Sequence, residues 1–517
     1  MGKIINGRKQ VIIGAALLFL TMLIFYAVVH PIYPFDGDDV QYLSNFSSLP
    51  IPYPRLWNPT RMLHQYLHPL TGYFAAYVIY PLSGDYLLST SIAIAIVMAV
   101  LITALYVVLY RLFISLYDNK NVCALLGIFS IALCFALFKS KPLNNVYLFH
   151  SRSYTCYLAY TAPNILNTIA VCELMRMFIR RKTLSFSLSS LRSALMLVLI
   201  YFCIFSIQFS LLILLAFAVS FLAYQFFTSA GRKEKFLPRL RQYGNDVFKY
   251  HHIAIIIILG TIISMMFETT GGRARWDDGN TFLGSVFSIE FLKRIYESAK
   301  YLVTNIRFFN LLILALLILL LVVSVILYAK NRKKETAAST VLAAKLCLFS
   351  GACFAIFNSV LTAKVSPFLN RVSFSVDNSF GLYMYVILFF SLAALYIIQK
   401  WRLFYLVFPL VTLSVLLIAA DSKWPYADSF YSNPNGSIYG MTIPKADAMK
   451  SYVMQIVEAD ARGETSVSLT VPKYSDGGNW PLTLGWADGL SKTLYRHRVT
   501  SKIMEITLIF DENMPLL

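Results

Sequence analysis

The stretch VIIGAALLFLTMLIFYAVV, residues 11–29, holds no charged side chain and is long enough to cross a bilayer as one helix. Lys3, Arg8 and Lys9 precede it. Cations beside a span favour the cytoplasmic side, so we predict a cytoplasmic N-terminus. The stretch is longer than a signal-peptide core and lacks a small-residue cleavage site. We therefore expect it to be retained as a membrane span.

An acidic cluster follows this span, Asp36-Gly37-Asp38-Asp39, on the side predicted to be external. Clustered carboxylates at the mouth of an apolar bundle are costly and hard to explain by packing. A carboxylate near a low-dielectric boundary can have its pKa raised towards the task of a general base. Asp36, Asp38 and Asp39 are therefore the predicted catalytic groups. The alternatives are a solvated acidic loop and the cation-binding acid pair of a transporter.

The composition is that of a helical membrane protein, since 58% of the 517 residues are hydrophobic and only 14% are charged. The formal net charge is +19, but the basic residues lie in short clusters at span ends. That pattern indicates membrane orientation and excludes nucleic acid as the expected partner. The seven cysteines lack metal-ligand spacing, so we predict neither a zinc site nor a disulfide framework.

We predict an all-α polytopic bundle with about eleven transmembrane helices. The predicted spans are 11–29, 86–112, 122–138, 163–179, 193–207, 209–227, 252–267, 309–329, 342–361, 381–398 and 403–420. The apolar stretch 193–227 is read as two helices with a turn near Ile207-Gln208, because one helix would expel the cations that follow it. The stretch 69–82 is short for a crossing and is read as an interfacial or part-inserted segment.

This map divides the chain into a transmembrane domain, residues 1–420, and a small external α/β domain, residues 421–517. In the second domain the apolar runs stop, and amphipathic and alternating patterns predict two helices and two strands. The helices are expected at 446–461 and 485–497, and the strands at 466–471 and 503–510. The external loops of the first domain cover 30–85, 139–162, 268–308 and 362–380.

The first external loop adds groups that suit a sugar phosphate. Arg55, Arg61 and His64 are candidate phosphate ligands, because such side chains supply charge-assisted hydrogen bonds. Tyr42 and Trp57 are candidate contacts for a sugar or an acceptor. Belt aromatics and snorkelling arginines are the alternative explanation for this loop.

The later external loops carry further candidates. Arg152 lies among tyrosines in the second loop and could bind the donor phosphate, although an interfacial belt explains the tyrosines equally well. Trp276 is a further candidate contact for a sugar or an acceptor. It belongs to a third loop that we interpret as a lid or docking surface, with an amphipathic helix at 288–300. Arg371 is a candidate anion ligand, and a span-end cation is the alternative.

The first loop resembles that of the GT-C superfamily, polytopic transferases that use a lipid-phosphate sugar. The resemblance rests on Phe35-Asp36-Gly37-Asp38-Asp39 directly after the first span, on Tyr42, and on the Trp57–Arg61 element. With the span layout and the small external domain, the chain is similar to the serotype-converting O-antigen glucosyltransferases of bacteria and their temperate phages.

The resemblance implies an inverting transfer of a glucosyl (hexosyl) group from undecaprenyl-phosphate sugar to lipid-linked O-antigen, on the periplasmic side of the bacterial inner membrane. It implies no required cofactor, with a divalent metal optional, and it leaves the base open between Asp38 and Asp39. The residues agree with a lipid-linked donor, because the chain has no nucleotide-binding motif and its cytoplasmic loops are too short for a nucleotide-binding fold.

Other functions stay open at this point. A different sugar, or lipid A as the acceptor, would fit the same features. A transporter or flippase of lipid-linked glycans would need ionisable residues near mid-membrane and repeated halves, and the sequence shows neither.

The span map predicts opposite locations for two reporter fusions. A reporter fused at Asn331 should be cytoplasmic and one fused at Pro444 external, because an odd number of spans keeps every dense cation cluster inside. A cytoplasmic signal at Pro444 would overturn both the span count and the placement of the second domain.

Overall fold

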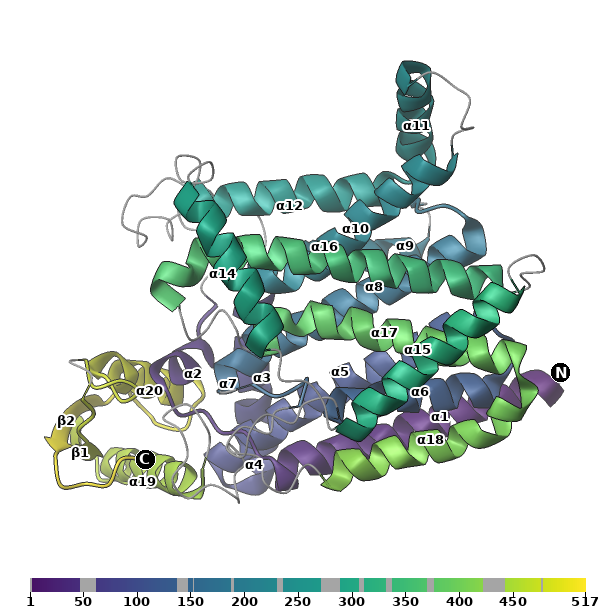
Figure 1. Ribbon diagram of the computed structural model, residues 1–517. Coiled ribbons are helices and arrows are strands. Elements are labelled where there is room, and N and C mark those ends of the chain that lie inside the picture. The colour runs from purple at the N-terminus through teal and green to yellow at the C-terminus, as the bar shows by residue number, and fades with distance from the viewer. Residues whose placement is uncertain are drawn as a thin grey trace.

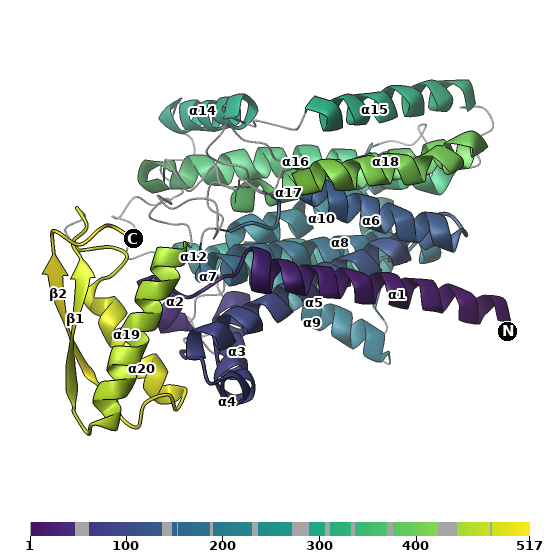
Figure 2. The same ribbon diagram turned by 90° about the horizontal axis from the view of Figure 1, so that it is seen from below.

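The protein is a helical bundle with a small mixed domain at one end (Figures 1 and 2). The computed structural model describes residues 2–46, 62–136, 147–151, 153–186, 190–229, 236–270, 289–305, 311–331, 337–369, 376–421, 442–475 and 478–517. The N-terminus lies at the end of the bundle opposite the mixed domain. We call the end that carries the mixed domain the domain end.

Each predicted span corresponds to a helix. These helices are α1 Gly2–Ile24 with η1 Phe25–Val29, α5 Tyr86–Ile114, α6 Lys120–Ala136, α8 Ala162–Arg181, α9 Leu191–Ile204, α10 Gln208–Ser229, α12 His252–Thr270, α15 Leu311–Asn331, α16 Ala338–Leu369, α17 Val376–Lys400 and α18 Arg402–Asp421. Among the described residues, 6 helices are long and apolar enough to cross a membrane. The chain is thus compatible with a multi-pass membrane protein, and the total of eleven spans stays a prediction.

The other predicted spans fall short of that criterion for identifiable reasons. Helices α6, α9 and α18 form only short apolar helices. Helix α12 is long and apolar enough only together with the amphipathic helix α11 (Phe236–Tyr250), at a bend of 91°, and the pair would make a seventh span. Helix α8 ends in Arg180 and Arg181, and within it Glu173 binds Arg111 at 3.1 Å, Arg192 at 3.1 Å and the buried Arg176 at 2.5 Å. Pairing lowers the cost of placing these groups inside the bundle.

Two predictions about ambiguous stretches can be compared with the structure. The break in 193–227 is confirmed, since α9 ends at Ile204 and α10 begins at Gln208. The stretch 69–82 is helical, forming parts of α3 Met62–Phe74 and η3 Ala75–Ile79 and most of α4 Tyr80–Ser83. These elements pack on α5 and leave Leu70 and Leu82 exposed, as an interfacial segment would.

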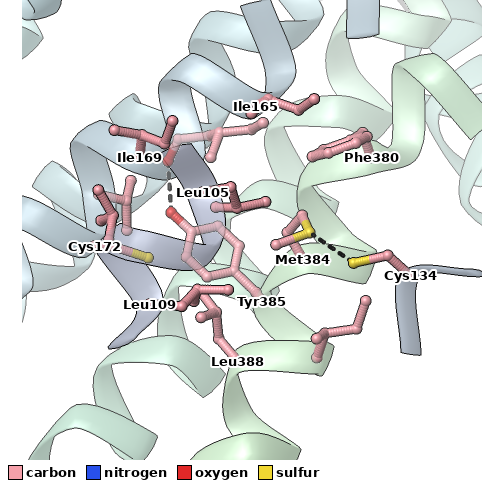
Figure 3. Packing of buried hydrophobic residues seen from close by; sticks show 14 of the residues in the cluster. Leu105, Leu109, Cys134, Ile165, Ile169, Cys172, Phe380, Met384, Tyr385 and Leu388 are labelled. Atoms are coloured by element: carbon pink, nitrogen blue, oxygen red, sulfur yellow. Dashed lines mark hydrogen bonds between the residues drawn. The ribbon is translucent and has the colours of Figure 1, made fainter. Parts of the chain in front are cut away.

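The bundle core is apolar and contains a few buried polar side chains that form hydrogen bonds. Tyr385 of α17 lies among Leu105, Leu109 and Cys172 and donates its hydroxyl to the carbonyl of Ile213 at 2.6 Å (Figure 3). The bond satisfies a hydroxyl that would otherwise be buried without a partner. All seven cysteines are free thiols.

The mixed domain has the predicted order of helices and strands. Its elements are α19 Ile443–Ala461, β1 Ser466–Pro472, α20 Leu484–Arg496 and β2 Glu505–Asp511. The two strands pair in parallel, with Ser466 opposite Glu505, and α20 makes the crossover that parallel strands need. The prediction of a small α/β domain is confirmed as a two-stranded sheet with two helices.

The mixed domain shares a buried core with the first loop. Phe35, Val40 and Tyr86 pack in one cluster with Tyr452 and Trp486 of the domain. The domain therefore does not hang from the bundle as a separate body. It covers helix α2 (Gly37–Tyr42), which carries the acidic cluster.

His497 lies at the centre of this interface. Its Nδ1 accepts the hydroxyl of Tyr86 at 2.8 Å, and its Nε2 donates to the carbonyl of Leu43 at 3.2 Å. Acceptance at Nδ1 needs the neutral ring with its proton on Nε2, because both nitrogens of a protonated ring are donors. Burial, with a smaller contribution from Arg496, lowers the pKa of His497 from 6.5 to about 4.

Docking of the mixed domain should therefore weaken in acid. The undocked ring binds a proton more readily, so the stabilisation is complete above about pH 6.5 and is lost as the pH falls towards 4. Between pH 7 and pH 5 the loss should be roughly 2 kcal/mol. Hydrogen exchange of α20 amides, corrected for intrinsic rates, measures it. His497→Gln should abolish this pH dependence, and an identical pH dependence in that variant would contradict the assignment.

Candidate active site

Two of the three acids build the start of helix α2. Asp36 is the N-cap, and its Oδ1 accepts the backbone N–H of Asp39 at 2.8 Å. The Asp39 Oδ2 in turn accepts the N–H of Asp36 at 3.4 Å. This reciprocal capping box satisfies N–H groups that a helix start would leave unpaired. Part of the acidic cluster is thus explained by local structure.

Asp39 also joins two loops. It is 1% exposed, and its carboxylate accepts the N–H of Phe35 at 3.0 Å and that of Thr155 at 2.7 Å. Thr155 belongs to the short helix α7 (Tyr154–Cys156), just before α8. Both carboxylate oxygens are therefore engaged with backbone groups, and Asp39 holds the second loop against the first.

The environment raises the pKa of both capping acids. Burial raises the pKa of Asp36 well above its usual value, and the charges of Asp39 and Asp38 raise it further. Burial also raises the pKa of Asp39, although the N–H groups of Phe35, Thr155 and Asp36 oppose the shift. Because its pKa is raised, Asp36 takes up a proton more easily than an ordinary carboxylate. The acidic cluster therefore carries less than its full negative charge.

Asp38 differs from its neighbours because its side chain is exposed. It lies on α2 one turn before Tyr42, and residues four apart share a helix face. Tyr42 packs against His64 of α3, with ring centroids 4.9 Å apart. The structure therefore places Tyr42 and His64 in contact, and Asp38 lies one helical turn before Tyr42.

The ring contacts continue into the bundle. The ring centroids of His64 and His68 are 5.3 Å apart, and His68 stacks on Tyr154 with the ring centroids also 5.3 Å apart. Both imidazoles are buried, at 3% and 0% exposure. The phosphate-binding role assigned to His64 stays a prediction, and the contacts show it as part of a packed aromatic row behind Asp38.

A fourth acid, Asp377, belongs to the same region and was not predicted as a site residue. It lies in the first turn of α17, is 7% exposed, and accepts the hydroxyls of Ser151 at 2.8 Å and Thr161 at 3.4 Å. Burial and the charge of Asp377, with smaller contributions from Asp36 and Asp39, raise the pKa of Cys156 to about 12. The sequence signal that could have indicated Asp377 was its position, as an acidic residue just before the apolar run of α17.

The remaining predicted site residues lie outside the described residues, so the structure does not place them. They are Arg55, Trp57, Arg61, Arg152, Trp276 and Arg371. The donor-phosphate cations accordingly stay predictions. Within the described part of the chain, no group of three or more His, Cys, Asp or Glu side chains is arranged to hold a metal ion.

Comparisons with protein-family models, with curated proteins and with solved structures find no match for this chain. The resemblance noted above therefore rests on the first-loop residues and on the layout of the chain. The chemistry of the site has to be argued from its own geometry.

The geometry predicts that substitutions of Asp39 and of Asp38 have different effects on the stability of the protein. Asp39→Asn replaces an accepting oxygen by an NH2 group that faces backbone N–H donors, which should cost about 1–3 kcal/mol. Asp38→Asn, the same change one residue earlier on an exposed side chain, should leave stability almost unchanged. Thermal unfolding of the purified variants tests this, and equal melting temperatures would contradict the structural role of Asp39.

Proposed function

We propose that the protein is an inverting glycosyltransferase of the membrane. It transfers a glucosyl (hexosyl) group from undecaprenyl-phosphate sugar to lipid-linked O-antigen, in the bacterial inner membrane, with the domain end facing the periplasm. The observation that supports this proposal is the different environment of two neighbouring acids in the cluster. Asp39 is buried and holds the loops, whereas Asp38 is exposed beside Tyr42.

The base in this mechanism is Asp38. A base must be ionised and must reach the acceptor, and water favours the ionised form of an exposed carboxylate. Asp38 takes the proton of an acceptor hydroxyl while the resulting oxygen attacks C1 of the donor sugar from the face opposite the phosphate. The C1–O bond to the lipid phosphate breaks, and the configuration at C1 inverts.

The lipid phosphate needs cations and no acid. A phosphate that leaves as an anion is a good leaving group, and positive side chains stabilise the charge that develops on it. Arg55, Arg61, Arg152 and Arg371, with His64, are the candidates in this chain. The same mechanism would serve a different hexose, or lipid A as the acceptor, because the acidic cluster does not itself select the sugar.

The proposal predicts which donor is used. Membranes that contain the protein should transfer sugar from undecaprenyl-phosphate glucose and not from UDP-glucose, once the enzymes that make the lipid donor are removed. Asp38→Asn should lower the rate by at least about a hundredfold, as loss of a general base commonly does.

Asp447→Asn is the matched control, since it makes the same change at an exposed position of α19. Turnover with UDP-glucose in those membranes would sink the mechanism. Undiminished turnover in the Asp38→Asn variant would show that Asp38 is not the base.

A further inference from the structure

A polar pocket of about 280 Å³ lies where the mixed domain meets the first loop. One wall is α2 and the turn after it, with Gln41, Ser44 and Asn45. The other wall is α20. Its residues at the pocket are Gly485, Asp488, Gly489, Lys492, Thr493 and Arg496.

The two walls are fixed to each other beneath the pocket. Thr493 donates its hydroxyl to the carbonyl of Val40 at 2.7 Å and lies 2.8 Å from the hydroxyl of Ser44. Gly489 lies directly against Gln41, because a Cβ built on it would be 3.5 Å from the Gln41 Cα. The pocket is thus part of a packed interface and keeps its shape.

The lining suits a neutral sugar. It presents an amide from Gln41 and another from Asn45, a carboxylate from Asp488 and two cations. Lys492 is paired with Asp488 at 2.7 Å, and Arg496 is directed to the Ser44 carbonyl at 3.4 Å. Lys492 and Asp488 offset each other's charge, and Arg496 leaves the lining with one positive charge in excess. The amides, hydroxyls and ion pair together offer both donors and acceptors, which the hydroxyl groups of a sugar require.

The pocket lies next to the proposed base. Gln41 follows Asp38 by three residues on α2, and side chains at that spacing are neighbours, with Cβ atoms roughly 5–6 Å apart. A sugar held between Gln41 and Asp488 would therefore lie beside the helix that carries Asp38. Ligand pockets typically measure roughly 300–1,000 Å³, so this one has room for a small group such as a single sugar of a longer glycan.

We propose that this pocket binds one neutral sugar residue of the acceptor glycan and so determines which hydroxyl reaches Asp38. The inference rests on the proposed function for the role of the sugar, but the binding itself can be measured without any transfer. It assigns acceptor choice to the junction of α2 and α20, with Gln41 and Asp488 as the selecting side chains.

The test begins with binding by the full-length protein in detergent. The probe is an array of neutral and anionic oligosaccharides, followed by titration in solution with the neutral glycan bound best. The double variant Gln41→Ala with Asp488→Asn should weaken binding about tenfold or more. Gly485→Leu tests the same site by volume, since a Cβ there meets nothing closer than the Thr483 hydroxyl at 3.5 Å.

Gln455→Ala is the matched control, because it removes the same amide from an exposed position of α19 outside the pocket. It should bind the glycan as the unaltered protein does. Equal binding by the pocket variants, binding of anionic glycans only, or no glycan binding would each overturn the proposal.

Two further outcomes separate this inference from the proposed function. If pocket-dependent binding is found but no polyprenyl-phosphate sugar is ever transferred, the pocket stands and the transferase function fails. If transfer occurs and the acceptor KM of the double variant is unchanged, the function stands and the pocket assignment fails.

Discussion

The carboxylate of Asp39 is the interaction on which the domain end depends. It accepts backbone N–H groups from Phe35, Asp36 and Thr155, and so joins the start of α2 to the helix that leads into α8. A buried carboxylate is expensive unless such donors surround it. Here three N–H groups offset that cost, whereas the neighbouring acid, Asp38, is exposed. The two adjacent acids thus have different environments, and the proposed mechanism assigns the base to the exposed one.

The mixed domain stabilises helix α2 in addition to the hydrogen bonds of Asp39. Helix α2 is only six residues long and would not persist by itself in water. One side of it is held by Asp39, and the other lies on α20 through Val40 and Gly489. Helix α2 is therefore stabilised by tertiary contacts from both sides. A short helix held in this way can present an exposed carboxylate at a defined position.

The sequence predicted the helices well, because apolar runs bounded by cations need no tertiary information. The elements of the mixed domain were also predictable, as in Ser466–Pro472, where side chains alternate. The sequence could not show that Trp486 packs near Gly37, because that contact has no local pattern. The spacing of Asp36 and Asp39 is that of a capping box and is a local pattern, but the bond from Thr155 that buries Asp39 has no such pattern. Asp377 escaped notice because its partners, Ser151 and Thr161, are far away in the chain.

The docking of α20 on α2 has a consequence for biosynthesis. The bond between Thr493 and Val40 joins residues 453 positions apart. Ribosomes add about 5–20 residues per second, so the first loop waits tens of seconds for its covering domain. During that interval Phe35 and Val40 lack the apolar partners they have in the finished fold. An incomplete chain thus has its acidic cluster without the packing of α20, and helix α2 gains its full set of contacts only after the mixed domain has been made.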